Sequence, residues 1–258
     1  MSNSVVNDDQ VLARYSRQML VPGIDFEGQE RLAAASILIV GCGGLGCPAA
    51  LYLAAAGVGR IRLVDDDHVE LSNLPRQIAF AEADVGTLKV TRLAEQLRVR
   101  NSEVIVDAVV GRFDVDTGSA LLDGIDIVLD ATDSQSARRA IDLLTYQQGL
   151  PWIMGTAVQM SGMWLPFSAR RSEGCYHCLA PSLITNARGG CETLGIVGPV
   201  VGAIALAQAF TVLAAITDCA PVRWGQLHLS DMRSGELQHL QLGRREYCPC
   251  CAGPTETA

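Results

Sequence analysis

The chain has 258 residues, of which 49% are hydrophobic and 19% are charged. This composition is typical of one large globular domain or two small ones, with enough apolar surface for a buried core. The formal net charge of -8 argues against binding to nucleic acid or to an anionic membrane surface. Aromatic residues make up only 5% of the chain, so a surface that stacks nucleic-acid bases is not expected either.

Nine cysteines are present, and an odd number cannot all pair in the disulfide framework of a secreted protein. Residues 1–10 are polar and lack the apolar core of a signal peptide. We therefore expect a reducing cytoplasm, where cysteines bind metal, take part in catalysis or pack in the core.

In chain order, the first predicted elements are helices at about residues 8–20 and 28–35. A continuous apolar run, Ser36 to Val40, then predicts a strand buried on both faces, as in a parallel sheet. From this run onward strands alternate with helices to about residue 150. The strands are expected at 36–40, 60–64, 104–110 and 125–130, and the helices at 47–56, 87–99 and 134–148. This alternation predicts a doubly wound α/β fold.

The pattern changes after residue 150. Strands are expected at 151–156, 160–167, 225–231 and 236–242, with one long apolar helix at 197–216. Pro199, Gln208 and Thr211 fall in that helix and its flanks lack a basic cluster, so we predict a buried core helix and no membrane span. No linker is visible. The sequence therefore predicts one Rossmann-like mixed sheet, parallel in the N-terminal half and antiparallel in the C-terminal half, within a single domain (1–258, with an ordered core of about 8–251).

A glycine-rich segment follows the first strand. Gly41-x-Gly43-x-x-Gly46 lies between a predicted strand and a predicted helix, where a tight turn and a helix N-terminus bind phosphate. Asp65 to Asp67 end the next strand, where an acidic residue binds a ribose hydroxyl. The alternative is a glycine turn that only allows close packing of helix and strand. The motif does not distinguish NAD from ATP.

Residues further along favour a triphosphate. Arg76 and Lys89 add two positive charges, which suit ATP better than a dinucleotide pyrophosphate. Asp133 follows a strand at the carboxyl edge of the sheet, where a carboxylate suits Mg²⁺. Taken singly, the two cations have a simpler interpretation as solvated surface groups, and Asp133 as the N-cap of the next helix.

Together these segments resemble the ThiF/MoeB/HesA family, the bacterial relatives of ubiquitin-activating enzymes. The resemblance runs from about residue 8 to 251, and Pro75 and Ser134 depart from the family pattern. It is carried, in order and spacing, by Arg14-Tyr-Ser-Arg17-Gln, Gly41-Cys-Gly-Gly-Leu-Gly46, Asp65-x-Asp67, Ser72-Asn-Leu-x-Arg-Gln77, Lys89 and Thr132-Asp133.

The resemblance implies adenylation, with Mg-ATP, of the C-terminal glycine of a small ubiquitin-fold sulfur-carrier protein ending in Gly-Gly. Pyrophosphate is released, and thiocarboxylate formation with a separate sulfur-donor protein follows. Arg17 resembles an arginine that reaches the neighbour's ATP site in a homodimer; its alternative is a solvent-facing helix residue. The implied nucleotide contacts are Gly41, Gly43, Gly44 and Gly46 as the cradle, Asp65 and Asp67 for ribose, Asn73, Arg76, Gln77 and Lys89 for the phosphate side, and Asp133 for Mg²⁺.

Two C-x-x-C pairs lie about 70 residues apart, Cys175/Cys178 and Cys248/Cys251. Two such pairs make a tetrahedral metal site with no open position, which is a structural role. The resemblance implies that the metal is zinc. A Cys248/Cys250 pairing stays open, and His177 is expected to be an exposed residue of the first pair.

The remaining cysteines fall into two groups. Cys191 falls in a polar, glycine-rich segment, and the resemblance links a cysteine at this place to sulfur transfer; the alternative is a free surface thiol. Cys42, Cys47 and Cys219 fall in apolar segments and are expected in the core.

The leading hypothesis is thus a carrier-protein adenylyltransferase, ThiF-like (thiamine thiazole synthesis) before MoeB-like (molybdopterin synthesis). An NAD-dependent oxidoreductase has no evident use for Arg76, Lys89 and the cysteine pairs. A non-catalytic scaffold for a ubiquitin-fold partner is disfavoured because Arg76, Lys89 and Asp133 are all present.

Overall fold

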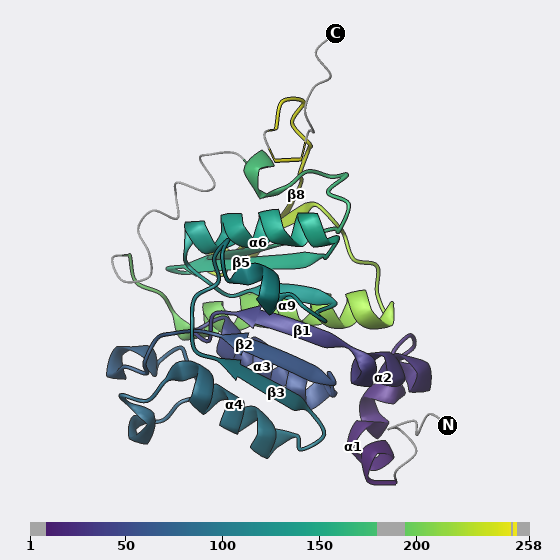
Figure 1. Cartoon of the computed structure of the whole chain (residues 1–258), viewed down its shortest axis with the longest axis vertical. Coiled ribbons are helices and arrows are strands. Elements are labelled where there is room, and N and C mark those ends of the chain that lie inside the picture. The colour runs from purple at the N-terminus through teal and green to yellow at the C-terminus, as the bar shows by residue number, and fades with distance from the viewer. Residues whose placement is uncertain (1–8, 180–193, 249, 252–258) are drawn as a thin grey trace.

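The computed structural model, which describes residues 9–179, 194–248 and 250–251, contains one eight-stranded sheet (Figure 1). The strand order is β3-β2-β1-β4-β5-β6-β7-β8. The first five strands pair in parallel and the last three pair antiparallel, so the predicted mixed sheet is confirmed. The strands are β1 (Ser36–Val40), β2 (Arg60–Val64), β3 (Ile105–Val109), β4 (Ile127–Asp130), β5 (Trp152–Val158), β6 (Ser161–Phe167), β7 (Gln226–Asp231) and β8 (Glu236–Gln241).

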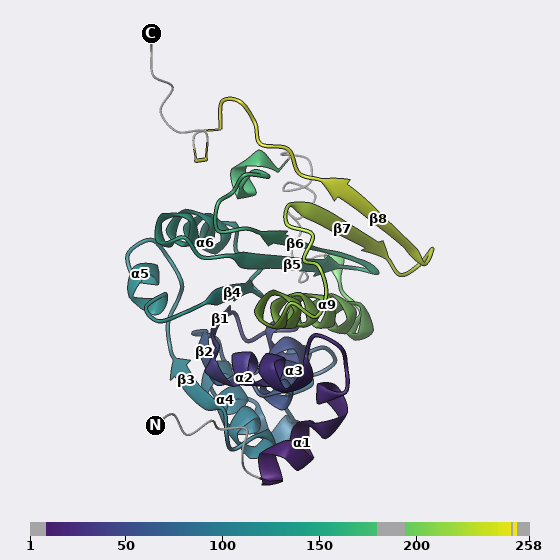
Figure 2. The same cartoon turned by 90° about the vertical axis from the view of Figure 1, so that its right-hand side faces the viewer.

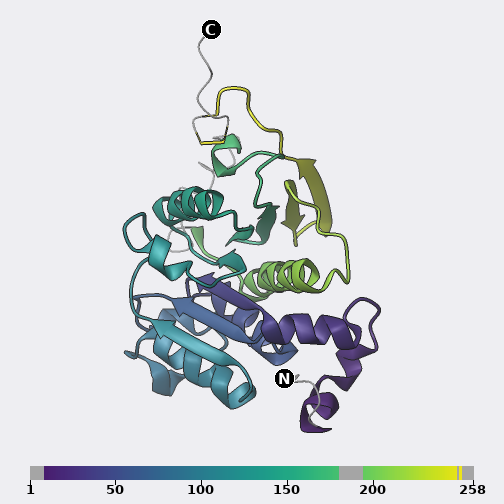
Figure 3. The ribbon, with the colours of Figure 1, turned by 45° about the vertical axis from the view of Figure 1, so that its right-hand side comes forward.

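Helices cover both faces of the sheet (Figures 2 and 3). Alternate residues of β1 point to opposite faces, so Ile37 and Ile39 join one core cluster while Leu38 and Val40 join the other. The first cluster is closed by α2 (Asp25–Ala34), α3 (Gly46–Ala56), α4 (Lys89–Arg100) and α9 (Gly198–Thr217), and the second by α5 (Gly118–Leu121) and α6 (Gln135–Gln148). This two-sided burial explains why β1 is a continuous apolar run.

Among the described residues one helix, α9, is long and apolar enough to cross a membrane. It packs against α3 and against β5 and β6. Its Gln208 is fully buried and donates hydrogen bonds to the backbone oxygens of Asp130, at 2.8 Å, and Ile153, at 3.2 Å. The α9 helix is therefore a core helix, as predicted.

The strand order reverses direction between β1 and β4, because β2 lies on one side of β1 and β4 on the other. In doubly wound folds a crevice forms at such a point, outside the carboxyl ends of the strands, and ligands bind there. The chain between β2 and α4 forms two short 3-10 helices, Leu71–Asn73 and Glu82–Asp84. The sequence did not predict these because a single turn has no hydrophobic period.

Candidate active site and metal centre

A cavity of 720 Å³ opens at the carboxyl ends of β1, β2 and β4. It is lined by residues from Val40 to Val201, at the place where the fold brings the strand ends together. Of the residues predicted to contact nucleotide, it is lined by Gly41, Gly43, Gly44, Asp65, Asp67, Asn73, Arg76, Gln77, Lys89 and Asp133.

Two glycines shape the turn at the end of β1. Gly41 has a φ of +96°, and a Cβ there would lie 2.8 Å from the backbone oxygen of Ala131. At Gly46 a Cβ would lie 2.0 Å from the backbone oxygen of Gly41, so no larger residue fits. Gly46 is buried and does not line the cavity. Its place in the motif therefore follows from the close packing of α3 on the turn, while Gly43 and Gly44 face the cavity.

The acidic turn after β2 is hydrogen-bonded to the glycine turn. Asp65 accepts hydrogen bonds from the backbone N–H of Cys42 at 2.6 Å and of Asp67 at 2.7 Å, one on each carboxylate oxygen. Burial raises the pKa of Asp65, and the two N–H donors and Lys89 oppose that rise. Asp67 is more exposed and faces the cavity, so its carboxylate is the more accessible of the two.

The two predicted cations, Arg76 and Lys89, both line the cavity. Lys89 is buried, and its Nζ lies 2.9 Å from Asp67 Oδ2, so it is not a solvated surface lysine. Arg76 donates from Nη1 to the backbone oxygen of Ser72 at 2.9 Å, and its aliphatic part lies beside Gly44. Asn73 is buried next to them and accepts a hydrogen bond from the Glu70 backbone N–H at 3.3 Å.

Asp133 also lines the cavity and is exposed. It does not cap α6. That position belongs to Ser134, whose hydroxyl accepts a hydrogen bond from the Ala137 N–H at 3.3 Å. The structure thus removes the N-cap interpretation of Asp133 and leaves its carboxylate free to face a ligand.

A buried ion pair that sequence reasoning missed fixes the loop before Asp133. Asp130, fully buried at the end of β4, lies 2.9 Å from Arg138 Nε. Burial raises the pKa of Asp130, and the Arg138 guanidinium opposes that shift. Asp130 also accepts hydrogen bonds from the N–H and hydroxyl of Thr132, while Arg138 donates to the backbone oxygens of Thr132 and Gly155. The available signal was a carboxylate at the end of an otherwise apolar strand.

The loop after β3 also contributes to the cavity. Arg112 and Asp114 line it, and Arg112 Nε lies 2.8 Å from Asp66 Oδ2. Sequence reasoning did not propose these two residues, although they follow a predicted strand at the same carboxyl edge of the sheet.

Arg17 lies far from this cavity within its own chain. It is exposed on α1 (Asp9–Met19), and the next residue, Gln18, donates to the backbone oxygen of Ala56 at 2.8 Å. Ala56 ends α3, whose first turn adjoins the cavity, and a helix of 11 residues is about 16 Å long. Arg17 is therefore at the opposite edge of the sheet. Cys191, another predicted functional residue, lies outside the described residues.

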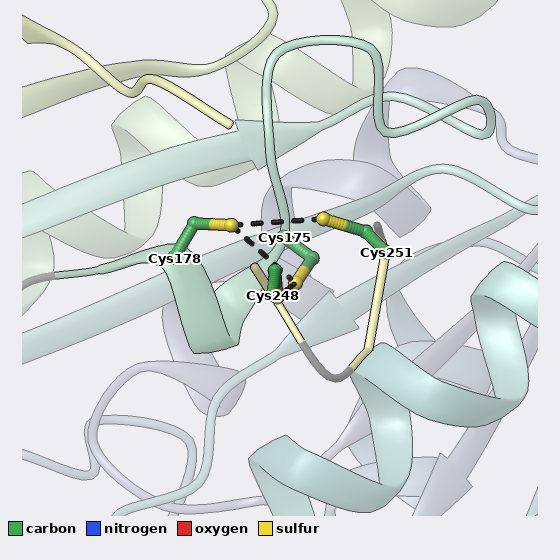
Figure 4. A group of neighbouring side chains, drawn as sticks. All are labelled: Cys175, Cys178, Cys248 and Cys251. Atoms are coloured by element: carbon green, nitrogen blue, oxygen red, sulfur yellow. Dashed lines mark hydrogen bonds between the residues drawn. The ribbon is translucent and has the colours of Figure 1, made fainter. Parts of the chain in front are cut away.

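Four cysteine sulfurs converge between η4 (Tyr176–Cys178) and the C-terminal segment (Figure 4). The Sγ–Sγ distances are 3.9 Å for Cys175/Cys178, 3.5 Å for Cys175/Cys248 and 3.6 Å for Cys178/Cys251. Four sulfurs at Zn–S bond lengths in a tetrahedron are about 3.8 Å apart. All four cysteines are buried. The geometry fits a tetrahedral metal ion.

The other cysteines are partly as predicted. Cys42 and Cys47 are buried in the core, and burial raises the pKa of both thiols, whereas Cys219 is only half-buried at the end of α9. Of the two pairings left open for Cys248, the four-sulfur cluster contains the one with Cys251. Cys250 Sγ lies instead 4.0 Å from Asp142 Oδ2. The prediction of an exposed His177 is wrong, because this side chain is half-buried beside Asp142.

Comparison with known proteins gives consistent results. The sulfur carrier protein ThiS adenylyltransferase of Escherichia coli is 39% identical over 249 residues, covering 95% of this chain and 97% of that protein. The molybdopterin-synthase adenylyltransferase of Salmonella typhimurium is 37% identical over 243 residues, covering 94% of this chain and 97% of that protein. Both alignments span nearly the whole of each chain.

Solved structures agree with the fold. Escherichia coli MccB with ATP superposes with a TM-score of 0.81 at 25% identity, covering 96% of this chain and 75% of that one. PaaA, at 22% identity and a TM-score of 0.79, shares the fold. The sequence pattern of the ThiF family matches residues 15–250. The chain therefore belongs to the ThiF family.

Proposed function

We propose that this protein adenylates the C-terminal glycine carboxylate of a small ubiquitin-fold sulfur-carrier protein ending in Gly-Gly. The observation that carries the proposal is the single cavity that holds the glycine turn, Arg76, Lys89 and Asp133 together at the strand ends. Relatives of the same length are adenylyltransferases of sulfur-carrier proteins. The reaction primes the carrier for thiocarboxylate formation in the cytoplasm, with sulfur supplied by a separate donor protein.

The chemistry requires two anions to approach each other. A carboxylate oxygen of the carrier bonds to the α-phosphorus of ATP, and the bond from that phosphorus to the bridging oxygen breaks, which releases pyrophosphate. Little covalent help is needed, so catalysis depends on positioning and on positive charge around the reacting phosphate. Arg76 and Lys89 face the cavity and supply that charge. The glycine turn lets the backbone approach the phosphates.

Two metal ions fit the residues present. The exposed carboxylate of Asp133 would hold Mg²⁺, which neutralises phosphate charge when bound. Cys175, Cys178, Cys248 and Cys251 would hold Zn²⁺ as thiolates. Four protein ligands leave no open position for a substrate, so the zinc would be structural, joining the C-terminal segment to η4.

Arg17 is proposed to act in a homodimer, in the cavity of the neighbouring subunit. The support is its exposure together with its distance from the cavity of its own chain. We expect Arg17→Ala and Arg76→Ala proteins to be inactive alone. In an equal mixture about half of the dimers are mixed, and each mixed dimer has one site with both arginines intact, so up to about a quarter of the wild-type sites should recover. Carrier-dependent ATP–pyrophosphate exchange after subunit mixing measures this, with Arg14→Ala as the matched control. Absence of recovery would count against the shared site.

Cys191 is proposed to handle sulfur after adenylation, with no part in adenylation itself. Cys191→Ser is expected to leave ATP–pyrophosphate exchange within about twofold of wild type and to impair thiocarboxylate formation in the presence of a sulfur donor. Mass spectrometry of the carrier separates the two steps. Loss of exchange in this variant would show that the division of roles is incorrect.

The function itself is tested with a panel of carriers that end in Gly-Gly. We expect exchange with Mg-ATP to depend on a carrier, and a ThiS-like carrier of the thiamine thiazole pathway to give the highest kcat/KM. A MoaD-like carrier as the best substrate would assign the enzyme to molybdopterin synthesis. No exchange with any carrier would favour a non-catalytic scaffold, and binding of NADH would favour an oxidoreductase.

A further inference from the structure

A second group of metal-ligating side chains lies directly beside the four-cysteine cluster. Asp142, Cys175, His177 and Cys250 each offer one ligand atom, and these atoms all lie within 4.8 Å of one another. We propose that they form a second site for a zinc-like divalent cation, with Asp142, His177 and Cys250 as its own ligands and Cys175 as a sulfur shared with the first site.

The distances are close to those of a metal site. His177 Nδ1 lies 3.6 Å from Asp142 Oδ2, and Cys250 Sγ lies 4.0 Å from the same oxygen. Ligand atoms in a tetrahedral zinc site are about 3.3–3.8 Å apart. A shift of roughly 0.5 Å or less brings these two pairs into that range, and the remaining pairs of ligand atoms lie within 4.8 Å of one another.

His177 provides an independent observation. Its Nδ1 is buried but has no hydrogen-bond partner in the described part of the chain. A buried polar atom without a partner is costly, and a bound cation would satisfy it. The atom is directed at Asp142, whose carboxylate carries the compensating charge.

Asp142 is held in place for this role. It is buried on α6, and its Oδ1 lies 3.2 Å from Nε of the buried Arg171. Its Oδ2 accepts a hydrogen bond from the Tyr176 backbone N–H at 3.1 Å. Metal-binding carboxylates are commonly fixed by such outer contacts. The arrangement leaves Oδ2 as the oxygen that faces His177 and Cys250.

The access route to this second site and the charge of its ligands also suit a zinc-like cation. A cavity of 510 Å³ beside α6 is lined by His177 and Cys250, which gives a cation a path to both ligands. The site combines two thiols, an imidazole and a carboxylate, a donor set that suits Zn²⁺ better than Mg²⁺ or Ca²⁺. Arg171 offsets part of the added negative charge.

Cys175 is the shared ligand. Its Sγ already lies 3.5 Å from Cys248 Sγ in the four-cysteine cluster, and a thiolate sulfur retains lone pairs for a second metal. This sharing rests on the proposed zinc site. With four protein ligands the second ion has no open position, so its role is structural: it ties α6, through Asp142, to the cysteine cluster.

Metal content of the full-length protein tests the proposal. Protein treated with chelating resin and then saturated with Zn²⁺ is expected to bind two ions per chain by elemental analysis. Cys250→Ser and His177→Gln are each expected to bind half as many, with adenylation activity unchanged. In Co²⁺-substituted protein, the sulfur-to-cobalt absorption should decrease in Cys250→Ser. Cys219→Ser, at another half-buried cysteine, is the matched control and should still bind two ions.

The outcomes separate the two sites. Cys178→Ser and Cys251→Ser remove ligands of the first site only, so no loss of metal in them would contradict the four-cysteine site. One ion per wild-type chain, or two ions retained in both Cys250→Ser and His177→Gln, would overturn the second site. Both of its variants alter half-buried side chains, so the folded protein remains available for measurement.

Discussion

Asp133→Asn is expected to lower the rate of carrier-dependent ATP–pyrophosphate exchange by about 100-fold or more, a loss typical of removing one group that stabilises transition-state charge. The substitution keeps the size of the side chain and removes its charge. Asp133 is exposed on the wall of the cavity and does not cap α6, so folding should be unaffected. The residual activity should require a higher Mg²⁺ concentration, because the proposed ligand of the ion has been weakened.

The control is Asp116→Asn, which removes an exposed carboxylate that does not line the cavity. It should keep wild-type exchange and wild-type Mg²⁺ dependence. Unfolding midpoints of both variants should match that of the wild type. Exchange within about twofold of wild type in Asp133→Asn would remove this residue from the proposed mechanism.

The largest effect on stability is expected for Arg138→Leu. The substitution leaves the carboxylate of Asp130 buried without its ion-pair partner, which typically costs about 3–5 kcal/mol. For a chain of this size the melting temperature should fall by roughly 10 °C. Arg138 also donates to the backbone oxygens of Thr132 and Gly155, so the loop that carries Asp133 should be less well fixed.

Arg139→Leu is the matched control, because Arg139 is the next residue on α6 and is exposed. Its free energy of unfolding should stay within about 0.5 kcal/mol of wild type. The double variant Asp130→Asn/Arg138→Leu removes the unpaired carboxylate charge and should recover part of the lost free energy of unfolding. A double variant no more stable than Arg138→Leu would show that the unpaired carboxylate is not the cause.

The residues of the candidate site were predictable where they directly follow a predicted strand in the sequence. Gly43 and Asp133 directly follow predicted strands, Lys89 lies in the first turn of a predicted helix, and the carboxyl ends of parallel strands share one edge. The four clustered cysteines were predictable for a similar reason, because the spacing within each C-x-x-C pair is local.

Residues paired across the fold were not predictable in this way. Asp142 and Cys250 are 108 positions apart, and Gln208 and Asp130 are 78 apart, so no spacing in the sequence relates them. The position of His177 was misjudged because exposure depends on what packs beside a turn. Gly46 was assigned to the phosphate cradle, but its neighbour is the backbone oxygen of Gly41.

The sequence by itself determined the mixed sheet, the order of its elements and the residue types of the two sites, because hydrophobic periodicity and motif spacing are properties of nearby residues. Only the tertiary structure decided which side chains meet. It placed Arg17 at the edge of the sheet opposite the cavity, gave the N-cap of α6 to Ser134, and separated Cys250 from the cluster of four cysteines. These outcomes depend on how helices pack on the two faces of the sheet, and such contacts join residues that are distant along the chain.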